Sequence, residues 1–156
     1  MAAHSAGILL HRMTASGLEV FLGHMGGPFW ARKQEHAWSI PKGEADEGES
    51  DLDVALREFA EELGSPAPEL PYVELATFRY SSGKTVTVFT AEAPDFEVAE
   101  LHSNEFEVEW PPRSGRMQRF AEFDAARWVE AAEARSLLVA GQVPALDALA
   151  IKLATT

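Results

Sequence analysis

The segment Ser50–Leu63 constrains the fold most, because it has the pattern of an amphipathic helix. Four apolar side chains recur on one face at helical spacing: Leu52, Leu56, Phe59 and Leu63. Ser50, followed three residues later by Asp53, has the pattern of a capping box, and Gly64 marks the end of the helix. We therefore expect a helix here whose apolar stripe is buried against the rest of the chain.

The remaining sequence mixes strand-like and helix-like segments. Strands are predicted by apolar or alternating patterns at 6–13, 18–24, 38–40, 72–80, 85–91 and 126–130. Turn residues join two pairs of these strands, at 14–17 and 81–83. Two further helices are expected at 131–138 and 143–153, and irregular structure at 94–119. Since the helices and strands do not alternate regularly, we expect an α/β (α+β) fold in one domain, 1–156.

Charge and composition exclude several classes of function. The 13 Lys and Arg residues stand against 25 Asp and Glu, a net charge of −12, so a nucleic acid polymer is not an expected partner. The chain has no Cys, which excludes disulfides and thiolate catalysis. It shows no signal peptide and no apolar run of the ~20 residues that a membrane helix needs. We expect a cytoplasmic protein with no membrane partner, and the sequence leaves its oligomeric state open.

Three acids share one side of the predicted helix: Glu58, Glu61 and Glu62. At about 100° per residue they lie in one wedge beside the apolar stripe. Three acids on a helix are usually a solvated surface, and like charges at this spacing repel unless a cation neutralises them. Mg²⁺ or Mn²⁺ suits carboxylate oxygens and leaves positions for water and phosphate. Arg57, at the edge of the wedge, is placed to hold Glu49 by a bidentate hydrogen bond and fix the preceding loop.

The spacing of these residues is more specific than their charge. Residues 43–64 follow the pattern G-x5-E-x7-R-E-U-x-E-E-x-G, where U is apolar. This segment resembles the Nudix box of the Nudix hydrolases, with one departure at Ser65, where that family usually has an aliphatic residue. The resemblance implies an α/β/α sandwich with a mixed β-sheet.

The same resemblance implies a reaction and its residues. It implies Mg²⁺-dependent hydrolysis, with Mn²⁺ as an alternative, of a nucleoside diphosphate linked to another group. Glu58, Glu61 and Glu62 match the metal-binding glutamates, and Glu58 is also a candidate general base. The backbone carbonyl of Gly43 is a further candidate ligand.

The flanks of the box resemble one group within that family. His36-Ala37-Trp38-Ser39-Ile40-Pro41-Lys42-Gly43 is similar to the diadenosine tetraphosphate hydrolases, as is the pair Tyr80 and Lys84. The resemblance implies substrate contacts at five positions: His36, Trp38, Lys42, Tyr80 and Lys84. In that group the Tyr can stack on adenine and the Lys reaches phosphates. Glu122, six residues before Trp128, matches a fourth metal-binding carboxylate. Trp38 also suits a place in the core.

Three functions remain open from the sequence. The first is hydrolysis of a dinucleoside polyphosphate such as diadenosine tetraphosphate. The second is a housecleaning NTP or dNTP pyrophosphohydrolase, and the third is a non-catalytic regulatory domain that binds a nucleotide. The complete set of box glutamates weighs against the third. Residues 110–115 have no counterpart in the diadenosine tetraphosphate hydrolases, and we expect them to form a wall of the cleft that alters which nucleotide fits.

Overall fold

The long strand β1 (His4–Thr14) is the centre of a mixed sheet in the computed structural model, which describes residues 3–155. It pairs antiparallel with β2 (Gly17–Met25) and β4 (Lys42–Glu44), and parallel with β6 (Thr85–Glu92). On one side β2 also pairs with β3 (Trp38–Ser39) and β9 (Phe123–Glu130). On the other side β6 pairs with β5 (Val73–Arg79). The sheet therefore combines parallel and antiparallel pairs, as the sequence predicts.

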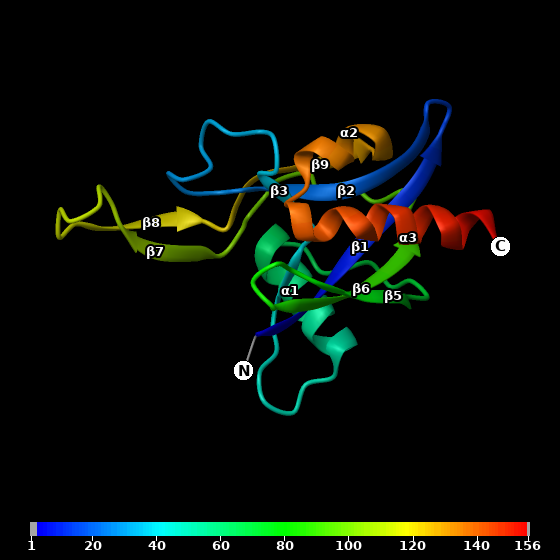
Figure 1. Cartoon of the computed structure of the whole chain (residues 1–156), viewed down its shortest axis with the longest axis horizontal. Helices are drawn as coiled ribbons and strands as arrows, with labels where there is room; N and C mark the ends of the chain where they lie inside the picture. Colours follow the sequence, from blue (N-terminus) through cyan, green and yellow to red (C-terminus); the bar gives the residue numbers. More distant parts are fainter. Residues whose placement is uncertain (1–2, 156) are drawn as a thin grey trace.

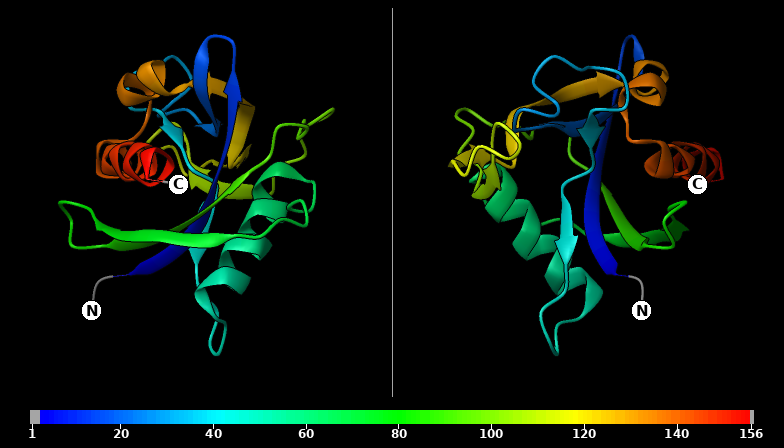
Figure 2. Two further views of the ribbon diagram at one scale, coloured as in Figure 1. Left: turned by 90° about the vertical axis from the view of Figure 1, so that its right-hand side faces the viewer. Right: turned by 60° about the vertical axis from the view of Figure 1, so that its left-hand side comes forward.

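Helices cover both faces of this sheet (Figures 1 and 2). Helix α1 (Asp51–Leu63) packs on one face, while α2 (Ala131–Leu137) and α3 (Val143–Ala154) pack on the other. The strands are buried on both sides, so their side chains alternate between two cores: Ile8 and Leu10 belong to the core under α1, and Leu9 to the core under α2 and α3. The expected α/β/α sandwich is confirmed.

Helix α1 begins and ends where its sequence predicts. The Ser50 side chain accepts a hydrogen bond from the backbone N–H of Asp53 at 3.2 Å, and Gly64 ends the helix with a φ of 74°. Its buried residues are Val54, Ala55, Phe59, Glu62 and Leu63. The buried face thus includes an acid, Glu62, which is central to the site below.

Two parts of the chain differ from the prediction. Strand β4 was not expected, because Pro41 and Gly43 have the pattern of a strand end. Within the stretch predicted to be irregular, β7 (Glu105–Glu109) and β8 (Met117–Ala121) pair as a separate two-stranded sheet. This hairpin projects from the body (Figure 1). In the described residues no helix is long and apolar enough to cross a membrane.

Candidate active site

A cleft of about 550 Å³ collects most of the predicted site residues at one edge of the sheet. It is lined by Ala3, Ser5, Lys42, Gly43, Glu44, Glu58, Glu61, Glu62, Tyr80, Ser82, Lys84, Thr85, Asn104 and Glu122. These residues come from the start of β1, from β4, from α1, from the turn between β5 and β6 with the first residue of β6, and from the base of the projecting hairpin. A second hollow of about 610 Å³, between α1 and residues 66–72, has an apolar lining and contains none of the predicted site residues.

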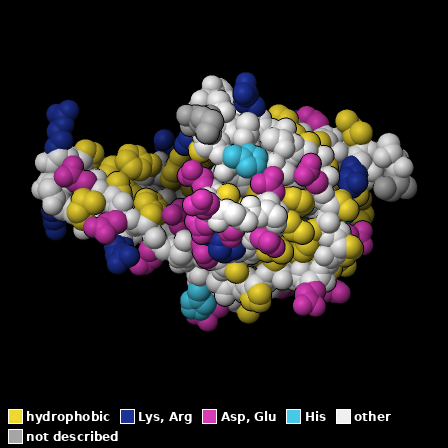
Figure 3. All heavy atoms as spheres, turned by 90° about the horizontal axis from the view of Figure 1, so that it is seen from below, with side chains coloured by type: hydrophobic (Ala, Val, Ile, Leu, Met, Phe, Trp, Pro, Cys, Tyr) yellow, Lys and Arg dark blue, Asp and Glu magenta, His cyan; other side chains and the backbone are white. Residues whose placement is uncertain are grey.

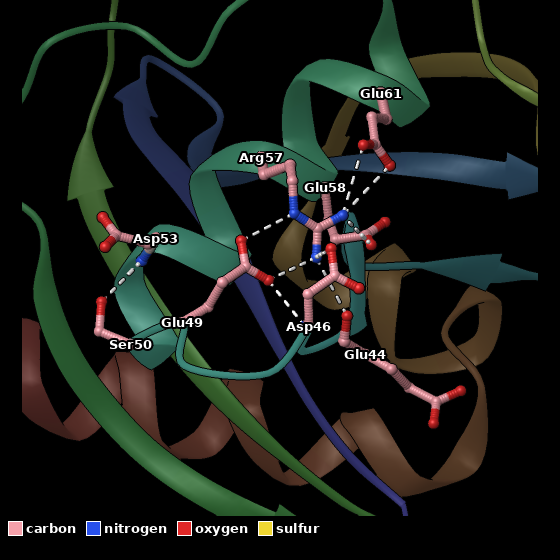
Figure 4. A network of polar contacts seen from close by, with 8 residues as sticks. All are labelled: Glu44, Asp46, Glu49, Ser50, Asp53, Arg57, Glu58 and Glu61. Atoms are coloured by element: carbon pink, nitrogen blue, oxygen red, sulfur yellow. Dashed lines mark hydrogen bonds and ion pairs between the residues drawn. The ribbon is translucent and has the colours of Figure 1, made fainter.

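Arg57 organises the acids at the start of the cleft (Figure 4). Its guanidinium donates two hydrogen bonds to the carboxylate of Glu49, at 2.9 and 2.8 Å, which is the bidentate arrangement expected from the sequence. Its Nη1 also donates to Glu58 at 2.9 Å and to Glu61 at 3.3 Å, and its Nη2 donates to the backbone carbonyl of Glu44 at 3.2 Å. The hydrogen bonds from Arg57 lower the pKa of Glu49 to about 2. One side chain therefore ties the loop before α1 to the acids on the helix.

Glu62 is held in the cleft from its buried side. It is 9% exposed, and its Oε1 accepts a hydrogen bond from the backbone N–H of Lys42 at 2.8 Å. Burial raises the pKa of Glu62 to about 8, although this hydrogen bond opposes the shift. A buried carboxylate with a single charge-stabilising donor is a costly anion, so this position favours a cation or a proton nearby.

Glu58 lies against the backbone of β4. A Cβ atom added to Gly43 would collide with the Glu58 carboxyl group, so only glycine allows this close approach. Burial raises the pKa of Glu58, and the neighbouring Glu61 carboxylate raises it further, while Arg57 opposes both effects. Gly43 and Glu58 are thus in direct contact, and so close enough together to be ligands of one metal ion.

Glu122 reaches the cleft from outside the box. It lies between β8 and β9, where its backbone N–H donates to the carbonyl of Asn104 and its carbonyl accepts from the N–H of Gly26, both at 2.8 Å. Burial raises its pKa, and the charge of Lys42 lowers it. The fold therefore brings Glu122 to the three carboxylates of α1, from which it is separated by sixty or more positions in the chain.

The donor set of the cleft suits a hard divalent cation. Four carboxylates and the carbonyl of Gly43 offer oxygen ligands only, which is the chemistry that Mg²⁺ and Mn²⁺ prefer. As the side chains stand in residues 3–155, no three of the His, Asp and Glu side chains converge tightly enough to enclose an ion. Arg57 and the Lys42 amide hold oxygens of Glu58, Glu61 and Glu62 instead. The fit thus rests on ligand type and on burial, which raises the pKa values of Glu58, Glu62 and Glu122 and makes their charged forms costly without a cation nearby.

The predicted substrate residues divide into two groups. Lys42, Tyr80 and Lys84 line the cleft. Trp38 does not, because it is 4% exposed in the core under α2 and α3. His36 does not line it either: its ring is bonded to the carbonyl of Leu138 at 2.8 Å, and it fixes the loop before β3 against the end of α2.

Other residues reach the site without any signal in the sequence. Asn104 lines the cleft from a stretch with no recognisable pattern. The tip of the hairpin, residues 110–115, does not line the cleft, so the prediction that it forms a wall of the cleft is wrong. The residues that flank the hairpin, Asn104 and Glu122, line the cleft instead. Seen from below, both basic and acidic side chains stand on the hairpin, and acidic side chains gather on the middle of the body (Figure 3).

Comparison with known proteins agrees with this fold and site. Residues 3–149 match the model of the NUDIX domain. The bis(5'-nucleosyl)-tetraphosphatase [asymmetrical] of Sus scrofa is 39% identical over 78 residues, which is 47% of this chain and 53% of that protein. The enzyme of the same name from Mus musculus is 41% identical over 68 residues, 40% of this chain and 46% of that protein. The chain thus spans about half the length of the curated relatives it matches. The expected resemblance to this group is confirmed.

Solved structures share the whole architecture. A binary complex of the Caenorhabditis elegans Ap4A hydrolase superposes with a TM-score of 0.71 at 22% identity, covering 99% of this chain and 100% of that one. The NUDIX domain of Shewanella oneidensis NrtR, complexed with ADP ribose, superposes with a TM-score of 0.68 at 18% identity, covering 98% and 89%. At these identities the likeness establishes the fold.

Proposed function

The chain belongs to the NUDIX domain family, and from this premise we propose that it hydrolyses a phosphoanhydride bond in a nucleoside diphosphate-linked compound. The substrate we propose is a dinucleoside polyphosphate such as diadenosine tetraphosphate. One observation carries the proposal: Glu58, Glu61, Glu62 and Glu122 line the same cleft as Lys42 and Lys84. The names of the curated relatives support the choice of substrate.

The acids of the cleft are proposed to hold Mg²⁺, with Mn²⁺ as the alternative. Glu58, Glu61, Glu62 and Glu122 would supply carboxylate oxygens, and Gly43 its backbone carbonyl. A bound divalent ion neutralises phosphate oxygens and makes a water molecule more acidic. It would also offset the free energy that burial costs the charged carboxylates of Glu58 and Glu62.

The protein side chains have separate tasks in this reaction. Lys42 and Lys84 attract the phosphate chain, which needs positive partners in an acidic protein. A water molecule attacks a phosphorus atom and the anhydride P–O bond breaks, so that the leaving phosphate keeps the bonding electrons. Glu58 accepts the proton of that water, a role favoured by its place in the cleft beside Gly43. Arg57, held by Glu49, keeps Glu58 in place.

A substrate panel tests the proposal. Purified protein with Mg²⁺, and separately with Mn²⁺, is incubated with diadenosine tetraphosphate, ATP and an oxidised dNTP, and the products are separated by anion exchange. We expect two mononucleotides from diadenosine tetraphosphate and no turnover in a chelator. If this compound stays intact while a triphosphate loses pyrophosphate, the substrate is a nucleoside triphosphate. If nothing is cleaved but a nucleotide raises the melting temperature, the protein is a binding module.

The variant Glu58→Gln tests the general base in the same assay. We expect turnover to fall by about 10²–10⁴-fold, the usual contribution of a positioned base, with little change in melting temperature. Glu47→Gln, in the exposed loop outside the cleft, is the matched control. Full activity of Glu58→Gln would contradict the assignment.

A further inference from the structure

Gln142 is a polar side chain that the fold buries completely. It ends the short 3₁₀ turn (Ala140–Gln142) before α3 and is 0% exposed. Its Oε1 accepts from the backbone N–H of Ile40 at 2.8 Å, and its Nε2 donates to Ser39 Oγ at 3.0 Å and to Tyr80 Oη at 2.9 Å. Since a backbone N–H can only donate, Oε1 must face Ile40, and the NH₂ group must face Ser39 and Tyr80. The orientation of the amide is therefore fixed.

Tyr80 is the aromatic side chain among the described residues that line the cleft. Its ring packs so closely on Gly141 that a Cβ atom there would collide with it. Its backbone closes the turn that carries Lys84, because the N–H of Tyr80 donates to the carbonyl of Lys84 at 2.8 Å. With the hydroxyl held by Gln142 and the ring held by Gly141, Tyr80 has a single position. An aromatic ring in the same cleft as two lysines suits a nucleotide, whose base stacks on aromatic faces and whose phosphates attract lysines.

The other end of the Gln142 amide binds the backbone of Ile40 in the core, just before β4. Ile40 lies two residues before Lys42, whose N–H binds Glu62 and whose side chain lines the cleft. One buried amide thus joins the segment that holds the proposed metal-binding acid to the ring that faces the substrate. Gln142 itself does not line the cleft.

We propose that Gln142 is a positioning residue that sets Tyr80 as the platform for the nucleobase of the substrate. This proposal rests on the proposed function, because it assumes that a nucleotide occupies the cleft. The base contact of Tyr80 is what the family resemblance implies, and the new element is Gln142 as the residue that positions Tyr80.

The test compares Tyr80→Phe and Gln142→Met with Tyr72→Phe. The first variant removes only the hydroxyl, so it keeps the ring and the fold even where Gln142→Met is unstable. Tyr72 also bonds through its hydroxyl, to the carbonyl of Pro68 at 2.6 Å, but lies outside the cleft and is the matched control. The readouts are kcat and KM for diadenosine tetraphosphate, and inhibition by inorganic tripolyphosphate, which has no base.

We expect Tyr80→Phe to raise KM about fivefold, the usual effect of one hydrogen bond, without lowering kcat, and Gln142→Met to raise KM at least as much. Inhibition of Tyr80→Phe by tripolyphosphate stays unchanged, and the double variant is no weaker than Gln142→Met alone, since Gln142→Met already removes the hydrogen bond that Tyr80→Phe removes. A wild-type KM in Tyr80→Phe overturns the proposal. Inhibition by tripolyphosphate that is weakened as much in Tyr80→Phe as substrate binding overturns it as well, because that result shows a general distortion of the cleft.

Failure of the proposed function is distinguishable from failure of this inference. If the wild-type protein cleaves no nucleotide, calorimetric titration with AMP and with tripolyphosphate replaces the kinetic readout. AMP affinity reduced about fivefold in Tyr80→Phe but not in Tyr72→Phe supports the role of Gln142 and Tyr80. Equal AMP affinities in the two variants overturn it.

Discussion

The acids of α1 differ in burial, and this difference determines what each can do. Glu62 is 9% exposed, whereas the side chain of Glu61 is 42% exposed. The free energy of a charged carboxylate depends on the water around it, so Glu62 has the larger cost as an anion. A cation in the cleft therefore stabilises the buried acid more than the exposed one.

Glu62 predicts how the stability of the metal-free protein depends on pH. Its pKa is about 8 when folded and 4.5 in an unperturbed chain. Between these values the folded state binds more protons than the unfolded state, so this residue lowers stability as the pH rises through the window. Glu62→Gln keeps an acceptor for the Lys42 N–H and removes the titration. We expect its melting temperature to exceed that of the wild type by several degrees above about pH 8, and by much less near pH 5.

The measurement is thermal unfolding in a chelator across this pH range. Glu69→Gln, at an exposed position, is the control and shows no such trend. A melting-temperature difference between Glu62→Gln and the wild type that stays constant with pH would show that Glu62 does not titrate in this window. Addition of Mg²⁺ at high pH should reduce this melting-temperature difference, because the ion stabilises the charged Glu62 carboxylate of the wild type, which Glu62→Gln lacks.

At the scale of elements, Arg57 joins a loop to a helix. Besides binding Glu49, it lies 3.6 Å from Asp46, and Glu49 in turn accepts from the Asp46 N–H at 2.8 Å. The loop thus depends on one guanidinium for its shape, and a lysine cannot reproduce the paired hydrogen bonds.

Arg57→Lys should loosen the loop and leave the helix in place. We expect amide hydrogen exchange in residues 45–50 to become roughly tenfold faster, since the lost hydrogen bonds involve charged groups, while α1 keeps its protection. Exchange measured by mass spectrometry tests this. Arg12→Lys is the control, because Arg12 binds Glu19 and Glu97 at a distance from the cleft. Unchanged exchange in the loop would mean that its backbone alone holds its shape.

The sequence predicts those elements that depend on interactions between neighbouring residues. The cap at Ser50 and the turn at 81–83 are read from neighbouring residues, and both stand as expected. The hairpin of β7 and β8 was missed because its alternating Phe106 and Val108 are diluted by charged residues, and its tip has the composition of a loop.

The site follows the same division. Glu49, Arg57 and Glu58 can be proposed from the sequence because one short motif carries them. Gln142 was not found, because its three partners lie 62 to 103 positions away and no local pattern marks such contacts.

On the scale of the whole molecule, the charge is unevenly placed. The segment 105–121 has three Glu and three Arg, which cancel, so the net charge of −12 belongs to the rest of the chain. The hairpin thus differs from the body in two ways: it has no net charge, and its strands form a sheet of their own. Its aromatic side chains Phe106 and Phe120 belong to neither core.

Several contacts hold the hairpin against the loop after β2, among them the close approach of Gly26 to the backbone of Ala121. Trp110 packs edge-on against Phe29, with ring centroids 5.2 Å apart, and Phe106 lies so close to Gly27 that a Cβ there would stand 2.7 Å from its ring. Because an isolated two-stranded sheet is marginally stable, these contacts are its main support. The backbone hydrogen bonds that hold Glu122, to Asn104 and Gly26, lie outside the hairpin strands.

Excision of the hairpin should therefore leave the folded body and the cleft acids intact. We expect a chain in which residues 106–120 are replaced by a short Gly-Ser linker to melt within a few degrees of the wild type, because neither core loses a side chain. Trp110→Ala, which removes only the contact with Phe29, should change the melting temperature less. Calorimetry gives the melting temperature, and calorimetric titration with Mg²⁺ reports on the cleft. A cooperative loss of structure on excision would show that the hairpin is part of the folding unit, and a loss of Mg²⁺ binding alone would show that Glu122 needs the strands beside it.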